Sequence, residues 1–366
     1  ERLLGEPVDL LRTRDVGLDR QHLDPALAKL ARGLGERLSL DVSQHHLRAD
    51  GDAVRCELCP HRCLIAEGKT GICRVRENKV GTLYALTYGM VAAAAMDPIE
   101  KKPLYHFHPG SAILSVGSVG CNLRCGFCQN YHLVLGQASL VPAVIPALVQ
   151  AAKEAGSVGI AYTYNEPLIW FEFVMDCAIA FRRAGMANVL VTNGYVSPEP
   201  LSELLPLVDA MNIDLKSMDP EFYRKNCGGT LDPVLGTIRS AARSVHVEVT
   251  SLLVTGENDD DDSIGRVVDF IAGTDPQIPL HFSRYFPHHR FTAPPTPPDR
   301  LEAAFRIARE KLSHVYVGNY RLPGGEDTKC PGCGAIAVRR AGYDVKASGL
   351  SGNRCARCSA PLRFVV

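Results

Sequence analysis

The sequence predicts an α/β protein whose core is a partial (β/α) barrel flanked by two small cysteine-rich modules. Three observations favour this fold: a chain of 366 residues that is 46% hydrophobic, alternating strand and helix patterns after residue 110, and thirteen cysteines that mostly fall in three groups. A chain of this length and balance can bury one large domain plus smaller modules. Acidic and basic residues balance to a formal net charge of zero, so no global field favours nucleic acid or an anionic membrane as a partner.

Residues 1–50 are expected to be helical. Asp24 and Pro25 suit the start of a helix, and leucines then recur at helical spacing. We find no secretory signal at the start of the sequence and no apolar run long enough to span a bilayer. Clustered cysteines in such a chain indicate metal ligation in a reducing, cytoplasmic setting.

Seven apolar segments are expected to form the strands of the core, with helices such as residues 142–155 and 167–184 between them. These segments are residues 111–117, 158–164, 188–193, 210–216, 246–254, 280–285 and 315–319. The alternation is typical of parallel βαβ units, and six or seven repeats suit a full or partial barrel with its active site at the carboxyl ends of the strands. A doubly wound open sheet is the alternative.

The chain is predicted to consist of a helical segment (1–50), a cysteine-rich module (51–96), the barrel (97–325) and a zinc-ribbon-like module (326–366). The boundaries follow the shift from cysteine-rich to alternating patterns and back.

The middle cysteine group, Cys121, Cys125 and Cys128, follows the first core strand through a glycine-containing turn. Three closely spaced thiolates fit three irons of a [4Fe–4S] cluster and leave the fourth iron open to another ligand, as a reactive metal site requires. The alternative is a zinc site in which a nearby residue such as His132 supplies the fourth ligand.

The segment GCNLRCGFCQNYH (120–132) resembles the CxxxCxFC signature of the radical S-adenosylmethionine (SAM) superfamily. The resemblance implies that SAM chelates the open iron and is reductively cleaved to a 5′-deoxyadenosyl radical, which abstracts a hydrogen from a substrate. It also implies that Phe127 lies near the adenine, and that a donor such as ferredoxin or flavodoxin supplies the electron.

Further segments resemble SAM-binding motifs of this superfamily. TYNEP (163–167) resembles the glycine-glycine-glutamate motif that holds the SAM amino group, with Tyr164 and Asn165 in place of the glycines. Glu166 is its charged candidate, because a carboxylate pairs well with an ammonium.

VTNGY (191–195) and NIDLK (212–216) resemble strand ends of the glycyl-radical-activating branch, where an aspartate before TNG and the DLK aspartate help to hold a cation. Val191 replaces the first of these aspartates here, and for Asp214 a structural salt bridge is the alternative. Taken together, the resemblance implies SAM contacts by Asn165, Glu166, Thr192, Asn193, Asp214 and Lys216.

The ordered set of motifs, including CELCPHRC (56–63), HFSRYFP (281–287) and CPGCG (330–334), is similar to a narrower family over roughly residues 50–366. These are the radical SAM enzymes of the AmmeMemoRadiSam system, which resemble pyruvate formate-lyase activating enzymes. The family name implies Memo-like and AMMECR1-like proteins as partners. It supplies no substrate.

The two outer cysteine groups suggest further metal sites. The last group forms two CxxC pairs spaced as in a zinc ribbon, where the metal would carry much of the fold of a small module; another Fe–S centre is the alternative. The first group suits zinc, which we slightly favour, or an auxiliary [4Fe–4S] cluster, and His61 could replace one of its ligands. The members are Cys330, Cys333, Cys355 and Cys358 in the last group, and Cys56, Cys59, Cys63 and Cys73 in the first.

Four other residues have a structural and a functional interpretation. Cys177 lies in a predicted helix and is expected in the core. Cys227 precedes a glycine pair and is either a small structural residue or a neighbour of the substrate. His281 and Arg284 are candidate substrate contacts; Arg284 could hold a carboxylate or phosphate in a bidentate manner, or form an internal salt bridge.

The sequence therefore favours a radical SAM enzyme with an unidentified substrate. A glycyl-radical enzyme activase is the alternative within this class, although such activases are shorter than this chain. A non-catalytic protein with three zinc sites is the alternative from another class.

Overall fold

The computed structural model describes residues 41–42, 45–48 and 51–366. Most of the helix predicted over residues 1–50 lies outside these residues. Its described end is not helical: β1 (Asp41–Val42) and β2 (His46–Arg48) are strands. They pair with β6 and β3 of the cysteine-rich module, so this stretch extends the module rather than forming a separate helical segment.

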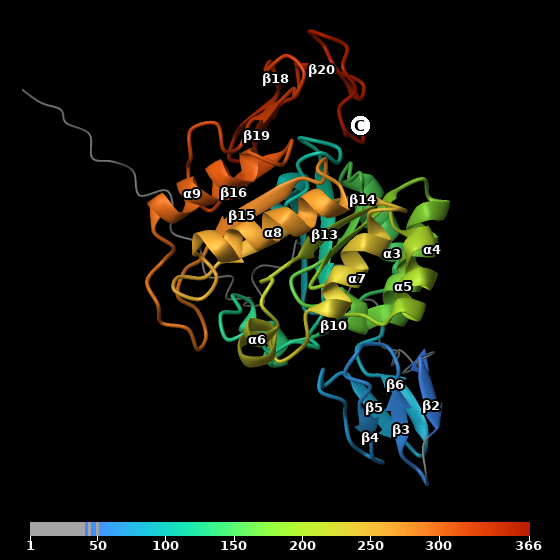
Figure 1. Cartoon of the computed structure of the whole chain (residues 1–366). Helices are drawn as coiled ribbons and strands as arrows, with labels where there is room; N and C mark the ends of the chain where they lie inside the picture. The colour runs from blue at the N-terminus through green and yellow to red at the C-terminus, as the bar shows by residue number, and fades with distance from the viewer. Residues whose placement is uncertain (1–40, 43–44, 49–50) are drawn as a thin grey trace, which may run out of the picture.

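Among the described residues, eight strands form the central sheet (Figure 1) in the order β16-β15-β14-β13-β12-β11-β9-β8. β8 pairs antiparallel with β9, and the strands from β9 to β16 are all parallel. Each of the seven predicted strand segments overlaps one of these parallel strands. The strands are β8 (Ala93–Pro98), β9 (Ala112–Gly117), β11 (Gly159–Tyr162), β12 (Ala187–Thr192), β13 (Ala210–Asp214), β14 (His246–Leu253), β15 (Leu280–Arg284) and β16 (Val315–Gly318).

The sequential order of the parallel strands distinguishes between the two predicted topologies. A doubly wound sheet reverses its strand order at a switch point, whereas a (β/α) barrel adds each strand beside the previous one. The present order is sequential from β9 to β16, and β8 and β16 end the sheet at separate edges. The sheet is therefore an open one with the strand order of a partial barrel.

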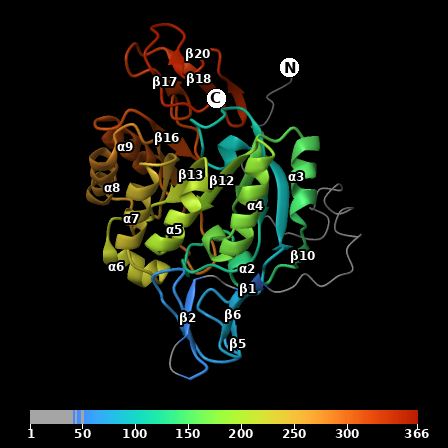
Figure 2. The same ribbon diagram turned by 90° about the vertical axis from the view of Figure 1, so that its right-hand side faces the viewer.

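Helices connect the strands and cover one face of the sheet (Figures 1 and 2). The connecting helices are α3 (Ile145–Glu154), α4 (Phe171–Arg183), α5 (Pro198–Leu204), α7 (Asp232–Ala241), α8 (Asp261–Thr274) and α9 (Pro298–Arg309). Shorter turns are η2 (Ile99–Lys101), α2 (Tyr131–Val134), η3 (Pro167–Trp170), η4 (Leu205–Leu207), α6 (Pro220–Phe222) and the π-helical η5 (Tyr223–Cys227).

The core lies between the sheet and these helices. All four residues of β11 are buried, as expected for a strand covered on both faces. Ile160 and Tyr162 belong to the cluster on the helix side, whereas Ala161 packs in a second cluster with Leu104 and Phe107. Helix α4 packs its apolar face against the sheet and buries Phe173, Val174 and Phe181. Cys177 of α4 is completely buried, which confirms its prediction as a core residue.

The N-terminal module contains the first outer cysteine group and lies at the carboxyl edge of the sheet. It consists of the three-stranded sheets β1-β6-β5 and β2-β3-β4, and the Leu58 carbonyl oxygen accepts a hydrogen bond from Ser197 N (3.0 Å), which follows β12. The remaining strands of this region are β3 (Val54–Cys56), β4 (Leu64–Ile65), β5 (Arg76–Lys79), β6 (Thr82–Ala85), and the pair β7 (Met90–Val91) and β10 (Val141–Pro142).

The C-terminal module lies at the opposite, amino edge of the sheet, and Figures 1 and 2 show the two modules at opposite ends of the core. His108, which precedes β9, donates its backbone N–H to the Val365 carbonyl oxygen (2.7 Å). Arg363 pairs with Asp275, which precedes β15. The module's strands are β17 (Thr328–Lys329), β18 (Ile336–Ala341), β19 (Asp344–Lys346), β20 (Leu350–Ser351) and β21 (Arg354–Cys355).

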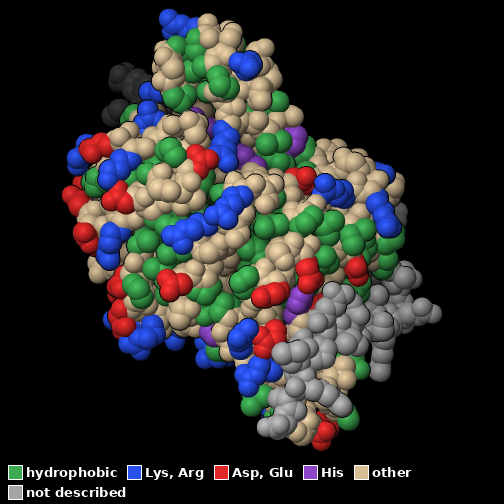
Figure 3. Space-filling view, turned by 45° about the vertical axis from the view of Figure 1, so that its right-hand side comes forward, with side chains coloured by type: hydrophobic (Ala, Val, Ile, Leu, Met, Phe, Trp, Pro, Cys, Tyr) green, Lys and Arg blue, Asp and Glu red, His purple; other side chains and the backbone are tan. Residues whose placement is uncertain are grey.

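The surface agrees with the zero net charge. On the face in Figure 3, basic and acidic side chains are interspersed over the core. Of the helices that the structure describes, none combines the length and hydropathy needed to cross a bilayer.

One buried ion pair joins the N-terminal module to the core. The Arg76 guanidinium donates to both carboxylate oxygens of Glu172 in α4, at 3.0 and 2.6 Å, and both side chains are about 1% exposed. Removing one member would leave the other charge buried without its main partner, which costs more than removing both.

We therefore expect Arg76→Met to lower the free energy of unfolding by about 3–5 kcal/mol. The double variant Arg76→Met/Glu172→Leu should recover much of this loss, because it leaves neither charge behind. Urea unfolding curves measure both effects. Arg224→Ala, in the exposed pair with Glu221, is the control and should leave the midpoint unchanged. Equal stabilities of the single variant and the wild type would contradict this account.

Candidate active site

The loop with the middle cysteine group leaves the carboxyl end of β9, as predicted. The strand ends at Gly117, where an added Cβ would lie 2.4 Å from the Thr163 carbonyl oxygen, so the close approach of β9 and β11 requires glycine there. Gly120 has a positive φ of 85° and turns the chain toward Cys121. The three cysteines are half-buried in the loop that follows.

The spacing of sulfur atoms separates the cysteine groups into two kinds. Around a zinc ion with Zn–S distances of about 2.3 Å, four sulfurs lie about 3.8 Å apart. Among the described residues, the group of ligand atoms that all lie within 4.8 Å of one another is Cys330, Cys333, Cys355 and Cys358. The sulfurs of Cys121, Cys125 and Cys128 do not all lie within 4.8 Å of one another. They are therefore not arranged around a single ion, which is compatible with a cluster in which each thiolate binds a different iron.

His132, the alternative zinc ligand, joins no such group in the described part of the chain. It lies in α2 after the cysteine loop. The three thiols thus fit a [4Fe–4S] cluster better than the alternative zinc site.

Two N–H groups point at the first thiol of the loop. Leu123 N lies 3.3 Å from Cys121 Sγ, and Asn193 Nδ2, from the end of β12, lies 3.5 Å from it. Burial, together with the nearby Glu166 carboxylate, raises the pKa of Cys121 well above its ordinary value, and burial raises that of Cys128 to about 11. Without a metal these thiols therefore keep their protons. A bound metal displaces the protons and takes the thiolates as ligands.

Asn165 of the TYNEP segment fixes the backbone of the cysteine loop. Its Oδ1 accepts a hydrogen bond from Ser118 N (2.9 Å), and its Nδ2 donates to the carbonyl oxygens of Val119 (3.1 Å) and Gly120 (3.2 Å). The resemblance implied a SAM contact for this residue. In the structure the Asn165 amide is hydrogen-bonded to the backbone of residues 118–120 instead, so Asn165 positions the loop.

Glu166 connects the TYNEP segment to the end of β12. Its carboxylate is 2% exposed and accepts hydrogen bonds from Leu168 N (2.9 Å), Thr192 Oγ1 (2.7 Å) and Asn193 N (2.8 Å). Burial raises the pKa of Glu166 to about 7 although these three bonds favour the carboxylate. A carboxylate offers about four acceptor positions, so one remains for a ligand donor.

The sequence of this chain is similar to those of known proteins. The model of the radical SAM superfamily matches residues 115–271, from β9 into α8. The chain is 42% identical over 332 residues to the uncharacterized protein MJ0808 of Methanocaldococcus jannaschii, and the match covers 87% of this chain and 98% of that protein. Residues 115–271 belong to the radical SAM superfamily.

Similarity to activating enzymes is confined to part of the chain. The pyruvate formate-lyase 1-activating enzyme of Escherichia coli K12 is 30% identical over 159 residues, which cover 41% of this chain and 65% of that enzyme. Among solved structures, a radical SAM methyltransferase from Sphaerobacter thermophilus matches over 81% of this chain and 82% of its own, with 14% identity and a TM-score of 0.46. The resemblance to the AmmeMemoRadiSam system remains a prediction.

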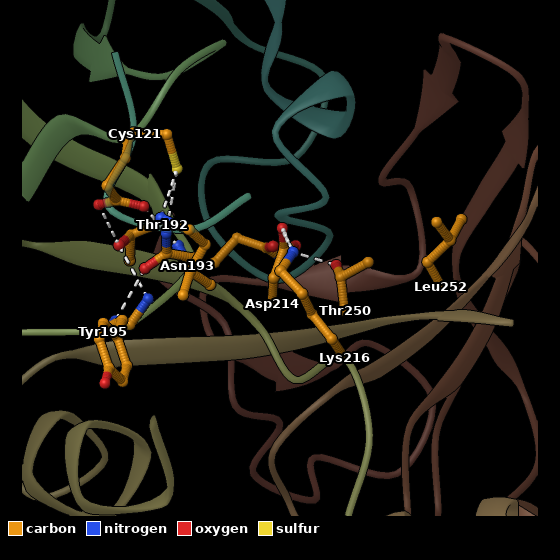
Figure 4. A network of polar contacts seen from close by, with 12 residues as sticks. Cys121, Thr192, Asn193, Tyr195, Asp214, Lys216, Thr250 and Leu252 are labelled. Carbon is orange, nitrogen blue, oxygen red and sulfur yellow. Dashed lines mark hydrogen bonds and ion pairs between the residues drawn. The ribbon is translucent and has the colours of Figure 1, made fainter. Parts of the chain in front are cut away.

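Asp214 and Lys216 lie at the end of β13, the next strand of the radical SAM sheet (Figure 4). Their side chains form an ion pair at 3.0 Å. Burial alone would lower the pKa of Lys216, but Asp214 and the neighbouring thiols raise it well above its ordinary value. Asp214 therefore forms the salt bridge considered as its alternative, and Val191 supplies no oxygen ligand from its side chain.

Phe127 lies inside an aromatic cluster beside the radical SAM loop. It is 4% exposed and packs against Phe222 and Phe291, with ring centroids 5.8 and 5.6 Å apart. Its predicted position near the adenine stays a prediction. What the structure shows is an apolar wall next to Cys128.

Cys227 is a site residue whose position sequence reasoning did not settle. It is completely buried, and its side chain lowers the pKa of the neighbouring Cys125. Its carbonyl oxygen accepts a hydrogen bond from Arg124 N (2.7 Å), and that of Asn226 accepts one from Gly126 N (3.0 Å). The π-helical turn η5 thus supports the backbone of the cysteine loop. No spacing rule connects Cys227 with the CxxxCxxC segment, so the sequence held no signal for this contact.

The prediction that His281 contacts the substrate is replaced by a structural role. His281 is the second residue of β15 and not its carboxyl end; its Nε2 lies 2.6 Å from Glu248 Oε2, and it is 5% exposed. Arg284 ends β15, and its Nε donates to the Thr296 carbonyl oxygen (2.9 Å). That leaves Arg284 an internal partner, although not the salt bridge considered as its alternative.

The C-terminal cysteine group has the geometry of a zinc site. Sulfur distances are 3.6 Å between Cys330 and Cys358 and 3.7 Å between Cys333 and Cys355, close to the value of about 3.8 Å that four zinc–sulfur bonds give. The group lies on the C-terminal module, at the edge of the sheet opposite the radical SAM loop. It is therefore suited to stabilising this module rather than to the chemistry.

We expect Asn165→Ala to loosen the cysteine loop and to lower its affinity for iron about tenfold, as removal of residues that orient metal ligands typically does. The measurement is the iron that remains per chain after a timed challenge with a chelator. Gln150→Ala, an exposed position on α3 whose side chain contacts Glu154, is the control. Equal iron retention in both variants would show that the loop holds its shape without Asn165.

Proposed function

We propose that the chain reductively cleaves SAM at a [4Fe–4S] cluster on Cys121, Cys125 and Cys128, and that the resulting radical abstracts a hydrogen atom from a substrate. The observation that carries this proposal is the set of three thiols in one loop at the carboxyl edge of the sheet. Their sulfurs do not all lie within 4.8 Å of one another, as ligands of a single ion would, and three thiolates leave the fourth iron open.

The cluster, when bound, supplies the electron that breaks the bond between sulfur and C5′ of SAM. The residues of the chain hold and orient the reactants. The N–H groups of Leu123 and Asn193 stabilise the Cys121 thiolate. The free acceptor position of Glu166 can accept a hydrogen bond from the SAM amino group, and the apolar wall with Phe127 excludes water.

A ferredoxin or flavodoxin is the proposed electron donor, and Memo-like and AMMECR1-like proteins are proposed partners on the sequence resemblance. A glycyl-radical enzyme activase is a second candidate function, favoured by the similarity to the pyruvate formate-lyase 1-activating enzyme. That similarity covers 41% of the chain. The additional cysteine modules favour a small molecule or another macromolecule as substrate.

The test is anaerobic: protein is reconstituted with iron and sulfide, reduced with dithionite, and assayed for 5′-deoxyadenosine from SAM. We expect nucleoside formation by the wild type and by the control Cys177→Ala. Cys121→Ala, Cys125→Ala and Cys128→Ala should each fall to the level without protein, because a cluster without three ligands is not held. A folded wild type that contains only zinc and forms no nucleoside would overturn the proposal in favour of the multi-zinc binding protein.

Glu166→Gln is expected to weaken SAM binding about tenfold. In the variant an amide NH₂ group replaces one carboxylate oxygen, so a donor faces a donor and an acceptor position is lost. Equilibrium binding to the oxidised, reconstituted protein measures this effect. Glu154→Gln, on the exposed surface of α3, is the matched control. An unchanged dissociation constant in Glu166→Gln, with an unchanged melting temperature, would exclude Glu166 as a SAM contact.

A further inference from the structure

The four cysteines of the N-terminal module come from the end of β3, from the turn after it and from the turn before β5. Cys56 ends β3 and its N–H donates to the Cys63 carbonyl oxygen (2.9 Å), while a turn closed by Arg62 N and the Cys59 carbonyl oxygen (3.0 Å) carries Cys59. Cys73 follows in the turn before β5. Cys56, Cys59 and Cys73 are each less than 9% exposed, and Cys59 lies within electrostatic reach of the other three thiols. Three of the four side chains are thus buried and Cys63 is half-buried; the place where the four gather is called the N-terminal pocket below.

Backbone N–H groups surround this pocket. Burial raises the pKa of Cys56, Cys59 and Cys73, and the nearby backbone N–H groups of Leu58, His61, Val75 and Arg76 partly oppose this rise because they favour the thiolate. Buried thiolates need such donors because water does not reach them. The pocket is thus built to hold negatively charged sulfur and the metal that goes with it.

Sulfur spacing indicates which metal fits. The C-terminal cysteines show the spacing that a single zinc ion imposes, with sulfurs 3.6 and 3.7 Å apart. Within the described residues, the N-terminal cysteines form no set of three sulfurs that all lie within 4.8 Å of one another. The same holds for Cys121, Cys125 and Cys128. In a cluster each thiolate binds its own iron, so the ligand sulfurs lie further apart than those around one ion.

His61, which could have replaced a cysteine ligand, has another partner. Its Nε2 lies 2.7 Å from the carbonyl oxygen of Asn122, in the loop of the radical SAM cluster. This contact leaves the four cysteines as the ligand set. It also ties the N-terminal pocket to the residue next to Cys121.

The pocket touches the radical SAM loop at a second point. An added Cβ on Gly120 would lie 2.6 Å from the Cys73 carbonyl oxygen, so the two cysteine-bearing turns are in backbone contact. Cys73 and Val75 also pack against Val119 and Ile169 in one apolar cluster. The zinc-like group lies at the other edge of the sheet, so this pocket is the one beside the active site.

We propose that Cys56, Cys59, Cys63 and Cys73 bind an auxiliary [4Fe–4S] cluster directly beside the radical SAM loop. Four thiolates fill all four irons, so this cluster has no open position for SAM. It differs in this respect from the cluster on Cys121, Cys125 and Cys128. The proposal replaces zinc, which the cysteine spacing in the sequence slightly favoured, and does not depend on SAM cleavage.

The test counts metals in the full chain after anaerobic reconstitution with iron and sulfide. We expect about eight irons and about one zinc per wild-type chain. The triple variant Cys121→Ala/Cys125→Ala/Cys128→Ala should keep about four irons, and its reduced electron paramagnetic resonance (EPR) spectrum should not change when SAM is added. Cys56→Ala/Cys59→Ala should also keep about four irons, with a spectrum that does respond to SAM. Cys177→Ala is the control and should keep the full set.

A wild type with about four irons and two zincs, together with a triple variant without iron, would overturn the proposal. The wild type and the triple variant decide the question even if Cys56→Ala/Cys59→Ala does not fold, because both leave the N-terminal module intact. No readout of this test is nucleoside formation. A failure of the proposed SAM cleavage would therefore leave the iron count unaffected, and the two proposals can fail separately.

Discussion

The architecture of the candidate site depends on the hydrogen bonds that Asn165 makes to the backbone of residues 118–120. The loop buries Leu123 and Phe127, and the hydrogen bonds to its backbone orient the three metal ligands. Asn165 follows β11, and the adjacent Glu166 binds the end of β12. Two consecutive residues thereby connect three parallel strands at the edge where the cysteines lie.

The two outer metal modules occupy opposite edges of the sheet, and this placement separates their roles. The C-terminal module contacts segments that precede β9 and β15, and its sulfurs have the spacing of a structural zinc site. The N-terminal module contacts Asn122 and Ser197 at the carboxyl edge, where (β/α) folds place their chemistry. Position in the fold and sulfur spacing thus agree: the C-terminal cysteines suit a structural zinc site, and the N-terminal cysteines lie beside the chemistry.

Local patterns predicted the seven parallel strands, because buried strands form apolar runs that the sequence displays directly. The cysteine groups were also visible, because thiol ligands are rare and closely spaced. Contacts between distant segments were not. Nothing in the sequence pairs Cys227 with Cys125. The TYNEP resemblance suggested a SAM contact for Asn165, but its amide is hydrogen-bonded to the backbone of the cysteine loop. Residues 41–42 and 46–48 were expected to be helical, but pairing with distant strands made them β-structure.

The central claim is that the loop of Cys121, Cys125 and Cys128 holds a cluster with one iron open to SAM. The most direct measurement is the EPR spectrum of the reduced, reconstituted Cys56→Ala/Cys59→Ala variant, which isolates this cluster, before and after SAM is added. The account predicts a changed spectrum, because SAM becomes a ligand of the open iron. A reduced cluster whose spectrum is the same with and without saturating SAM would contradict it.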